Sequence, residues 1–105
     1  MIKYYKYNIG KRKKVFLKIS DNLEDIAKPF KKFKGLISFK ELSIEPTNLG
    51  GPAEVFIGSG MSRMSEFEPK FKLYKAEEIS EEEYLDALFK IDCVKQEIDR
   101  IFKEL

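Results

Sequence analysis

Residues 80–105 read SEEEYLDALFKIDCVKQEIDRIFKEL, and no other part of the chain has so clear a pattern. Ser80 and Glu83 have the spacing of a capping box, in which each side chain satisfies a backbone N–H of the first helical turn. Apolar residues then recur at alternating intervals of three and four, as they do on one face of an amphipathic helix. These apolar positions are Tyr84, Ala87, Ile91, Val94, Ile98, Ile101 and Leu105. We therefore predict a C-terminal amphipathic helix over residues 80–105.

The same spacing is that of a coiled-coil seam, so two uses of this helix stay open. At about 1.5 Å per residue the helix is about 38 Å long, close to the diameter of a compact domain of this size. It can lie across a sheet along its whole length, or its end can project and pair with another copy. The second interpretation predicts a homo-oligomer whose interface is formed by Ile98, Ile101, Phe102 and Leu105.

The first twenty residues predict a β-hairpin. Val15, Leu17 and Ile19 alternate with other residues, which is the period of two expected for a half-buried strand. Residues 2–9 are rich in Tyr and Ile, two residue types that favour strands. Gly10 lies between the two stretches and suits a tight turn, so we expect the strands to pair antiparallel.

The middle of the chain predicts further strands over 36–44, 53–57 and 70–75, and one short helix near residues 22–34. A length of 105 residues suits one hydrophobic core. The expected architecture is therefore a single α+β domain over residues 1–105. Its antiparallel sheet has four to five strands and is packed by the long C-terminal helix.

The composition excludes several classes of function. The chain contains no His and one Cys, so a disulfide framework, a Cys/His zinc site and a histidine-based catalytic triad are ruled out. We expect no metal, no cofactor and no enzymatic activity. No apolar run approaches the roughly 20 residues of a membrane span, and the N-terminus lacks the apolar stretch of a secretory signal. The expected location is cytoplasmic, without membrane association.

Charge is distributed unevenly along the chain. Residues 1–40 carry twelve Lys or Arg against three acidic residues, whereas residues 76–105 carry ten acidic residues against four basic ones. Such asymmetry indicates either a polyanion-binding face or two faces that partly neutralise each other. The densest basic cluster is a candidate patch for a protein or nucleic-acid partner, and it consists of Lys11, Arg12, Lys13 and Lys14.

A glycine- and serine-rich stretch is the candidate ligand site. Residues 58–65 read GSGMSRMS and predict a loop that continues to residue 68. Backbone N–H groups in glycine turns can form an anion-binding nest, and a guanidinium can contact the same oxygens. The stretch matches neither a P-loop nor a dinucleotide fingerprint, and glycines that serve turns alone are the alternative. The candidate ligand-binding residues are Gly58, Ser59, Gly60, Ser62, Arg63 and Ser65, with Gly50 and Gly51.

In size and in its lysine- and glutamate-rich character, the chain resembles the small accessory proteins of phages and mobile elements, and this resemblance implies action by binding. The leading hypothesis is a non-enzymatic binding protein that sequesters a small anionic ligand such as a nucleotide. The alternative is an inhibitor or adaptor that docks on a protein or nucleic-acid partner through the basic N-terminal hairpin. The two hypotheses place function in different parts of the chain.

Overall fold

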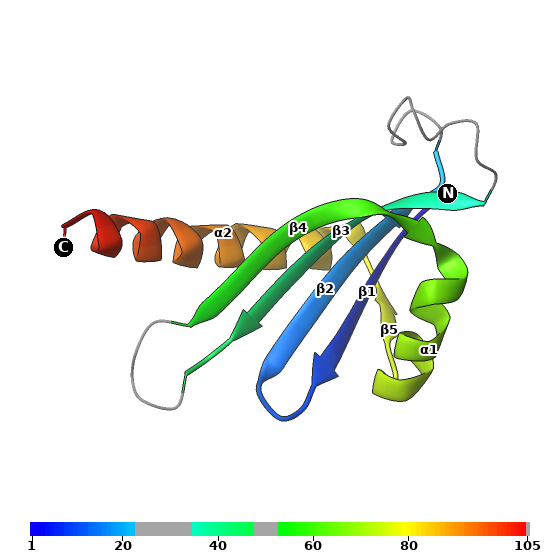
Figure 1. Cartoon of the computed structure of the whole chain (residues 1–105), viewed down its shortest axis with the longest axis horizontal. Helices are drawn as coiled ribbons and strands as arrows, with labels where there is room; N and C mark the ends of the chain where they lie inside the picture. Colours follow the sequence, from blue (N-terminus) through cyan, green and yellow to red (C-terminus); the bar gives the residue numbers. More distant parts are fainter. Residues whose placement is uncertain (23–34, 48–52, 105) are drawn as a thin grey trace.

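The computed structural model describes residues 1–22, 35–47 and 53–104 (Figure 1). The chain forms an α+β fold with an antiparallel sheet and a long C-terminal helix, which confirms the predicted fold class. The elements in chain order are β1 (Ile2–Ile9), β2 (Lys13–Ser20), β3 (Leu36–Glu45), β4 (Glu54–Arg63), α1 (Met64–Tyr74), β5 (Glu77–Ile79) and α2 (Glu81–Glu104). The short helix predicted near residues 22–34 lies outside the described residues.

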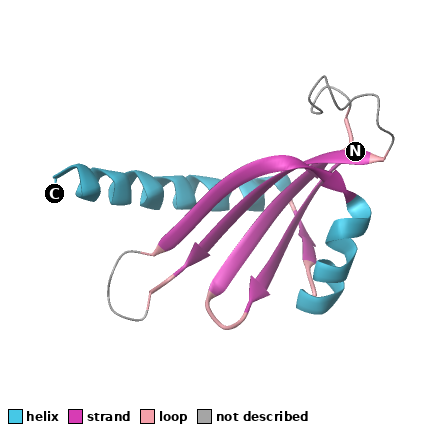
Figure 2. Ribbon diagram, viewed as in Figure 1, coloured by secondary structure: helices cyan, strands magenta, loops and turns pink. Residues whose placement is uncertain are grey.

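In the described part of the chain, five strands form one sheet in the order β4-β3-β2-β1-β5. Each pair is antiparallel, and β1 to β4 are neighbours both in the chain and in the sheet. Gly10 has a φ of 68° in the turn between β1 and β2, a conformation that glycine adopts without strain. After β4 the chain passes through α1 to the opposite edge of the sheet, where β5 pairs with β1 (Figure 2).

The two helices pack on opposite faces of the sheet and over different ends of it. Ile37 and Phe39 of β3 belong to the apolar cluster that includes Phe67 of α1. Leu42 and Ile44, farther along the same strand, belong to the cluster of α2. Because successive side chains of a strand point to opposite faces, these two pairs lie on opposite sides of the sheet. The apolar alternation of β3 therefore changes phase in its middle.

The prediction of a loop from residue 58 to 68 is wrong, because β4 continues to Arg63. Its glycines have a packing role instead. A Cβ atom at Gly58 would lie 2.5 Å from the ring of Phe56, and one at Gly60 would lie 3.0 Å from the ring of Phe39. The two glycines thus leave room for aromatic rings that lie over the strand.

The predicted strand over 70–75 is also wrong, because these residues belong mostly to α1. Phe67 is buried and Phe71 packs beside it, at the i and i+4 positions of one helix face. Leu73, which a strand would place on the same side as Phe71, is 72% exposed. The helix includes Pro69, so packing of the two Phe side chains on the sheet outweighs the backbone hydrogen bond that Pro cannot donate.

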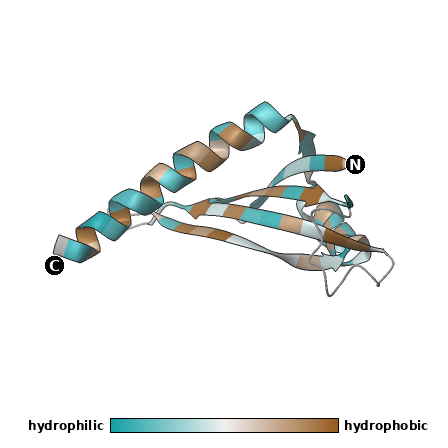
Figure 3. Ribbon diagram, turned by 90° about the horizontal axis from the view of Figure 1, so that it is seen from above, coloured by the Kyte–Doolittle hydropathy of each residue, from teal (hydrophilic) through white to brown (hydrophobic). Residues whose placement is uncertain are grey.

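The long helix α2 begins as predicted, and its first half is the part that packs. The Glu83 N–H donates a hydrogen bond of 3.1 Å to Ser80 Oγ, which confirms Ser80 as the cap. Tyr84, Ala87 and Ile91 are buried against the sheet. Beyond them the helix projects past the sheet on the side of β4 (Figure 1), and Figure 3 shows hydrophobic residues recurring along it. Among the described residues, no helix is long and apolar enough to cross a membrane.

Candidate functional site

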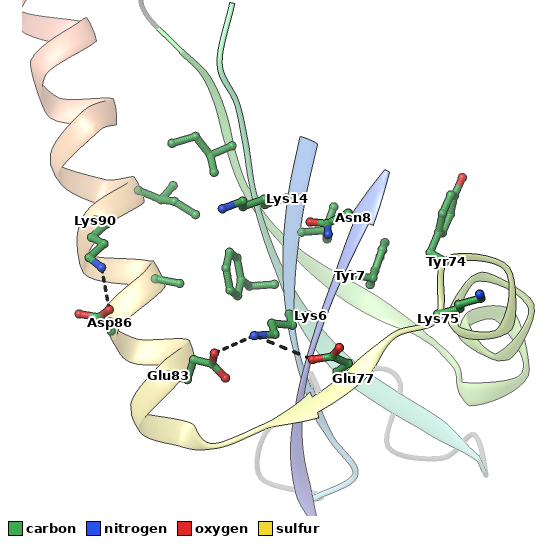
Figure 4. Close-up of a pocket in the computed structure, with 15 residues that line it drawn as sticks. Lys6, Tyr7, Asn8, Lys14, Tyr74, Lys75, Glu77, Glu83, Asp86 and Lys90 are labelled. Atoms are coloured by element: carbon green, nitrogen blue, oxygen red, sulfur yellow. Dashed lines mark hydrogen bonds and ion pairs between the residues drawn. The ribbon is translucent and has the colours of Figure 1, made fainter. Parts of the chain in front are cut away.

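A cleft of about 520 Å³ lies at the end of the sheet where β1 turns into β2 (Figure 4). It is bounded by α2 on one side and by the C-terminal end of α1 on the other. β5 pairs with Tyr4–Lys6 of β1, so the following residues of β1 lie along a sheet edge that opens into the cleft. Strands, both helices and the edge therefore contribute side chains to the same space.

The floor of the cleft is apolar. Ala87 and Ile91 of α2 are buried, and Phe16 and Ile44 of the facing strands are half-buried beside them. Such side chains offer a surface for a flat apolar group, because contact with it removes further apolar area from water. A cavity with this kind of floor and a few polar groups at its rim is the usual form of a small-molecule site.

Two tyrosines form the side of the cleft next to α1. The rings of Tyr7 and Tyr74 are stacked, with centroids 5.5 Å apart. Burial raises the pKa of Tyr7 to about 12, and the negative charge of Glu41 and the Tyr74 hydroxyl add to the shift. Tyr7 therefore keeps its proton at neutral pH.

The acidic side chains of the cleft are all in ion pairs. Lys6 Nζ lies 2.9 Å from Glu83 Oε1 and 3.9 Å from Glu77 Oε2. The hydrogen bond to Glu83 raises the pKa of Lys6, so the pair stays charged up to high pH. On the rim, Lys90 Nζ lies 3.0 Å from Asp86 Oδ2.

Two lysines of the cleft remain without such a partner. Lys14 and Lys75 make no ion pair with any residue that the structure describes. Figure 4 places Lys14 between the strands and α2, and Lys75 on the side of α1. Asn8 lies directly opposite Lys14 in the register of β1 and β2, so an amide and an ammonium group stand side by side. The cleft thus combines an apolar floor with surplus positive charge.

The residues predicted to form one anion-binding loop are distributed over β4 and α1. The Ser62 hydroxyl donates a hydrogen bond to the Glu66 carboxylate. Arg63 is exposed at the end of β4, and Ser65 is exposed in the first turn of α1. Gly50 and Gly51 lie outside the described residues. The loop geometry behind the predicted backbone nest is therefore wrong, while ligand binding by these side chains stays a prediction.

Ser59 and Gly60, however, border a second depression of about 290 Å³ on the face that α2 partly covers. Lys18 of β2 lies directly opposite Lys40 of β3, and Lys40 lies directly opposite Ser59 of β4. Sequence reasoning missed this row. Lys18 and Lys40 occupy polar positions of two strands, but the strand register that brings them together is not encoded in either segment alone.

The predicted partner patch lies at the tip of the first hairpin. Lys11, Arg12 and Lys14 are exposed and Lys13 is half-buried. None of the four pairs with an acidic group in the described part of the chain. Docking of a macromolecule on this tip stays a prediction.

The predicted oligomer interface lies on the projecting end of α2. Ile98 is half-buried, whereas Ile101 and Phe102 are exposed, Phe102 more so at 67%. Leu105 lies outside the described residues. Pairing of two copies through this segment stays a prediction.

Comparison with known proteins finds no family model, no curated protein and no solved structure that matches this chain. What the chain binds is therefore inferred from its own side chains.

Proposed function

We propose that the chain is a non-enzymatic binding protein that sequesters a small anionic ligand with a flat apolar body, such as a nucleotide, in the cleft between α2 and α1. One observation carries this proposal: buried apolar side chains form the floor of a cleft in which Lys14 and Lys75 have no carboxylate partner among the described residues. The apolar body of such a ligand would pack on the floor of the cleft, and its anionic end would neutralise the positive charge of the two lysines.

The ligand's orientation follows from the position of these groups. Its ring system would lie on Phe16 and Ile44, where an aromatic ring offers an offset-stacking partner. Its anionic end would point toward Lys14 and Asn8, which supply an ammonium and an amide donor from neighbouring positions. Hydrogen bonds to a charged group are stronger than those between neutral groups, so the anionic end would contribute much of the affinity.

The chemistry of the cleft favours binding over catalysis. Glu83 and Glu77 are held by Lys6, and Asp86 is held by Lys90. Tyr7, with its pKa of about 12, is a poor base at neutral pH. A general base must be free to accept a proton near the operating pH, and these groups are either paired or protonated.

Calorimetric titration with mononucleotides and with phenyl phosphate tests the proposal. The Lys14→Gln variant removes the charge and keeps most of the side-chain length. We expect its affinity to fall by roughly 10- to 100-fold, because a hydrogen bond to a charged group contributes about 1.5–3 kcal/mol. The thermal midpoint should not change, since Lys14 is exposed.

Lys72→Gln is the matched control, because Lys72 is an exposed lysine of α1 that does not line the cleft. Its affinity should equal that of the unmodified chain. An Ala87→Leu variant, which extends a side chain into the cleft from its floor, should also lose binding. Equal affinity of the Lys14→Gln variant and the control, or no binding of any of these ligands at millimolar concentration, would contradict the proposal.

A further inference from the structure

Lys18 and Lys40 form a like-charge pair in the interior of the sheet. They are directly opposite each other in the register of β2 and β3, so their Cβ atoms are about 5 Å apart. Both side chains are half-buried, and their aliphatic parts lie along the sheet face. Like charges placed directly opposite on antiparallel strands destabilise a sheet. The arrangement therefore has a cost that some other interaction must offset.

The described residues do not supply a carboxylate for either lysine. Glu41 follows Lys40 in β3, so its side chain points to the other face of the sheet. On the same row, Tyr4 lies opposite Lys18, and the Tyr4 hydroxyl is hydrogen-bonded to Glu81. Neither ammonium group thus has an ion-pair partner among the described residues.

The surroundings of the pair supply further donors and space. Ser59 lies directly opposite Lys40 on β4, and its side chain is exposed on the same face. Lys18, Lys40 and Ser59 border the depression of about 290 Å³, together with Ser38 and Met61. The neighbouring row, with Phe16 and Leu42, is covered by α2, and on the row of Lys18 the helix contacts Tyr4 through Tyr84. The depression therefore lies beside the helix and stays open to a ligand.

We infer that Lys18, Lys40 and Ser59 form a binding site for a tetrahedral oxyanion, namely a phosphate, either free or as the end group of a small phosphomonoester. Two ammonium groups and a hydroxyl supply donors from three strands, and a doubly charged anion between the lysines converts their repulsion into attraction. The site is separate from the cleft and does not depend on the proposed function. It includes Ser59 of the sequence-predicted ligand stretch, but side chains on strands replace the backbone nest.

Thermal unfolding at increasing phosphate concentration, with ionic strength held constant by chloride, tests this inference. Phosphate should raise the midpoint of the unmodified chain, because a ligand that binds the folded state stabilises it. The Lys40→Gln variant should unfold at a higher temperature than the unmodified chain in the absence of phosphate, since the repulsion is gone. It should also show no rise with phosphate. The lost response to phosphate is the result that distinguishes a binding site from like-charge repulsion alone.

Two control variants and a second ligand complete the experiment. Lys72→Gln and Lys70→Gln change exposed lysines of α1 that line neither the cleft nor the depression, and both variants should keep the response to phosphate, which separates this site from general surface charge. Glycerol phosphate distinguishes the two sources of the anion: a rise equal to that with phosphate indicates an end-group site, and a smaller rise indicates a site for free phosphate. The inference is overturned if phosphate leaves the midpoint of the unmodified chain unchanged, or if Lys40→Gln keeps the full response.

Discussion

The two ends of β3 differ in the face that they bury. At the Leu36 end, Ile37 and Phe39 pack toward α1, whereas at the Glu45 end Leu42 and Ile44 pack toward α2. The strand is continuous and its pairing with both neighbours is regular throughout. The buried side of a strand is therefore set locally, by the helix that covers that part of it, and one strand can serve two cores.

The same division explains why the row of Lys18 and Lys40 is basic. Leu17 and Ile19, the neighbours of Lys18 in β2, are buried on the α1 side of the sheet. In this part of the sheet the α1 face already forms a core, so the residues of the opposite face do not have to be apolar. Charged side chains can therefore stand there without loss of the core on the α1 side.

The largest effect is expected from truncating a core residue at either end. Leu42 is fully buried under α2 and Ile37 is buried under α1. Leu42→Ala and Ile37→Ala should each lower the free energy of unfolding by about 2–5 kcal/mol, measured by urea denaturation. Similar losses would support two cores of equal importance. A loss of stability in Leu42→Ala alone would contradict the idea of two equal cores and would show that the packing of α1 contributes little to stability.

A smaller effect is expected at the glycines of β4, and it should differ between them. The ring that a Cβ atom at Gly60 would meet belongs to Phe39, which packs edge-on against Phe67 with centroids 5.2 Å apart. Because Phe39 is held in place, Gly60→Ala should destabilise by about 1–3 kcal/mol, as overpacking does.

Gly58→Ala is the matched comparison. The ring above Gly58 belongs to Phe56, which is 53% exposed and can swing into solvent. Gly58→Ala should lower the free energy of unfolding by less than about 1 kcal/mol, as substitutions at the surface usually do. Urea denaturation of the two variants side by side measures the difference. Equal losses in the free energy of unfolding would show that Phe39, although packed in the α1 cluster, moves aside as easily as the exposed Phe56.

The smallest effect is expected at the α2 end, from a hydroxyl group. Tyr84 is buried, and its hydroxyl has no hydrogen-bond partner among the described residues. Tyr84→Phe removes a polar group whose desolvation is not compensated, so the free energy of unfolding at neutral pH should be unchanged or higher by up to about 1 kcal/mol. A clear loss of stability would instead reveal a partner for this hydroxyl.

The same substitution should change the response to alkaline pH. Burial raises the pKa of Tyr84 to about 12 from 10.0, with a smaller contribution from Tyr4. Between these values the unfolded chain has lost a proton that the folded chain keeps, so stability falls as the pH rises. Tyr84→Phe should make this fall less steep, and the part due to Tyr7 should remain. Unfolding curves between pH 9 and about 12 measure the two slopes.

The predictable parts of the fold are those with a local pattern. The alternation of Val15, Leu17 and Ile19 and the cap at Ser80 predict β2 and the start of α2, and both are confirmed. The predictions for residues 58–75 are wrong because the structure of this segment depends on its contacts with other strands of the sheet. Position 60 of the strand is a glycine because the ring of Phe39 on the neighbouring strand occupies the space of a side chain there. Phe71 forms a helix face with Phe67, but in the sequence it also alternates with Leu73 as in a strand.

The candidate sites depend even more on tertiary structure. Lys14 belongs to the basic cluster visible in the sequence, but its position over an apolar floor follows from the path of α2. The pairing of Lys18 with Lys40 follows from the register of two strands that are separated by a long connection. Composition indicates that positive charge is abundant in the first half of the chain, and the fold decides which lysines meet.

The strand order also bears on how the molecule assembles. Pairing among β1, β2, β3 and β4 joins neighbours in the chain, so each step closes a shorter loop, at a lower cost in entropy, than the pairing of β1 with β5. The β1–β5 pairing joins the first strand to the segment between the two helices, and β5 contributes three residues to it. We expect this seam to form last and to open first, by sub-global unfolding that leaves the first four strands intact. Since Glu77 of this seam lines the cleft, we expect the proposed ligand to enter and leave by opening of this sheet edge while the rest of the sheet stays folded.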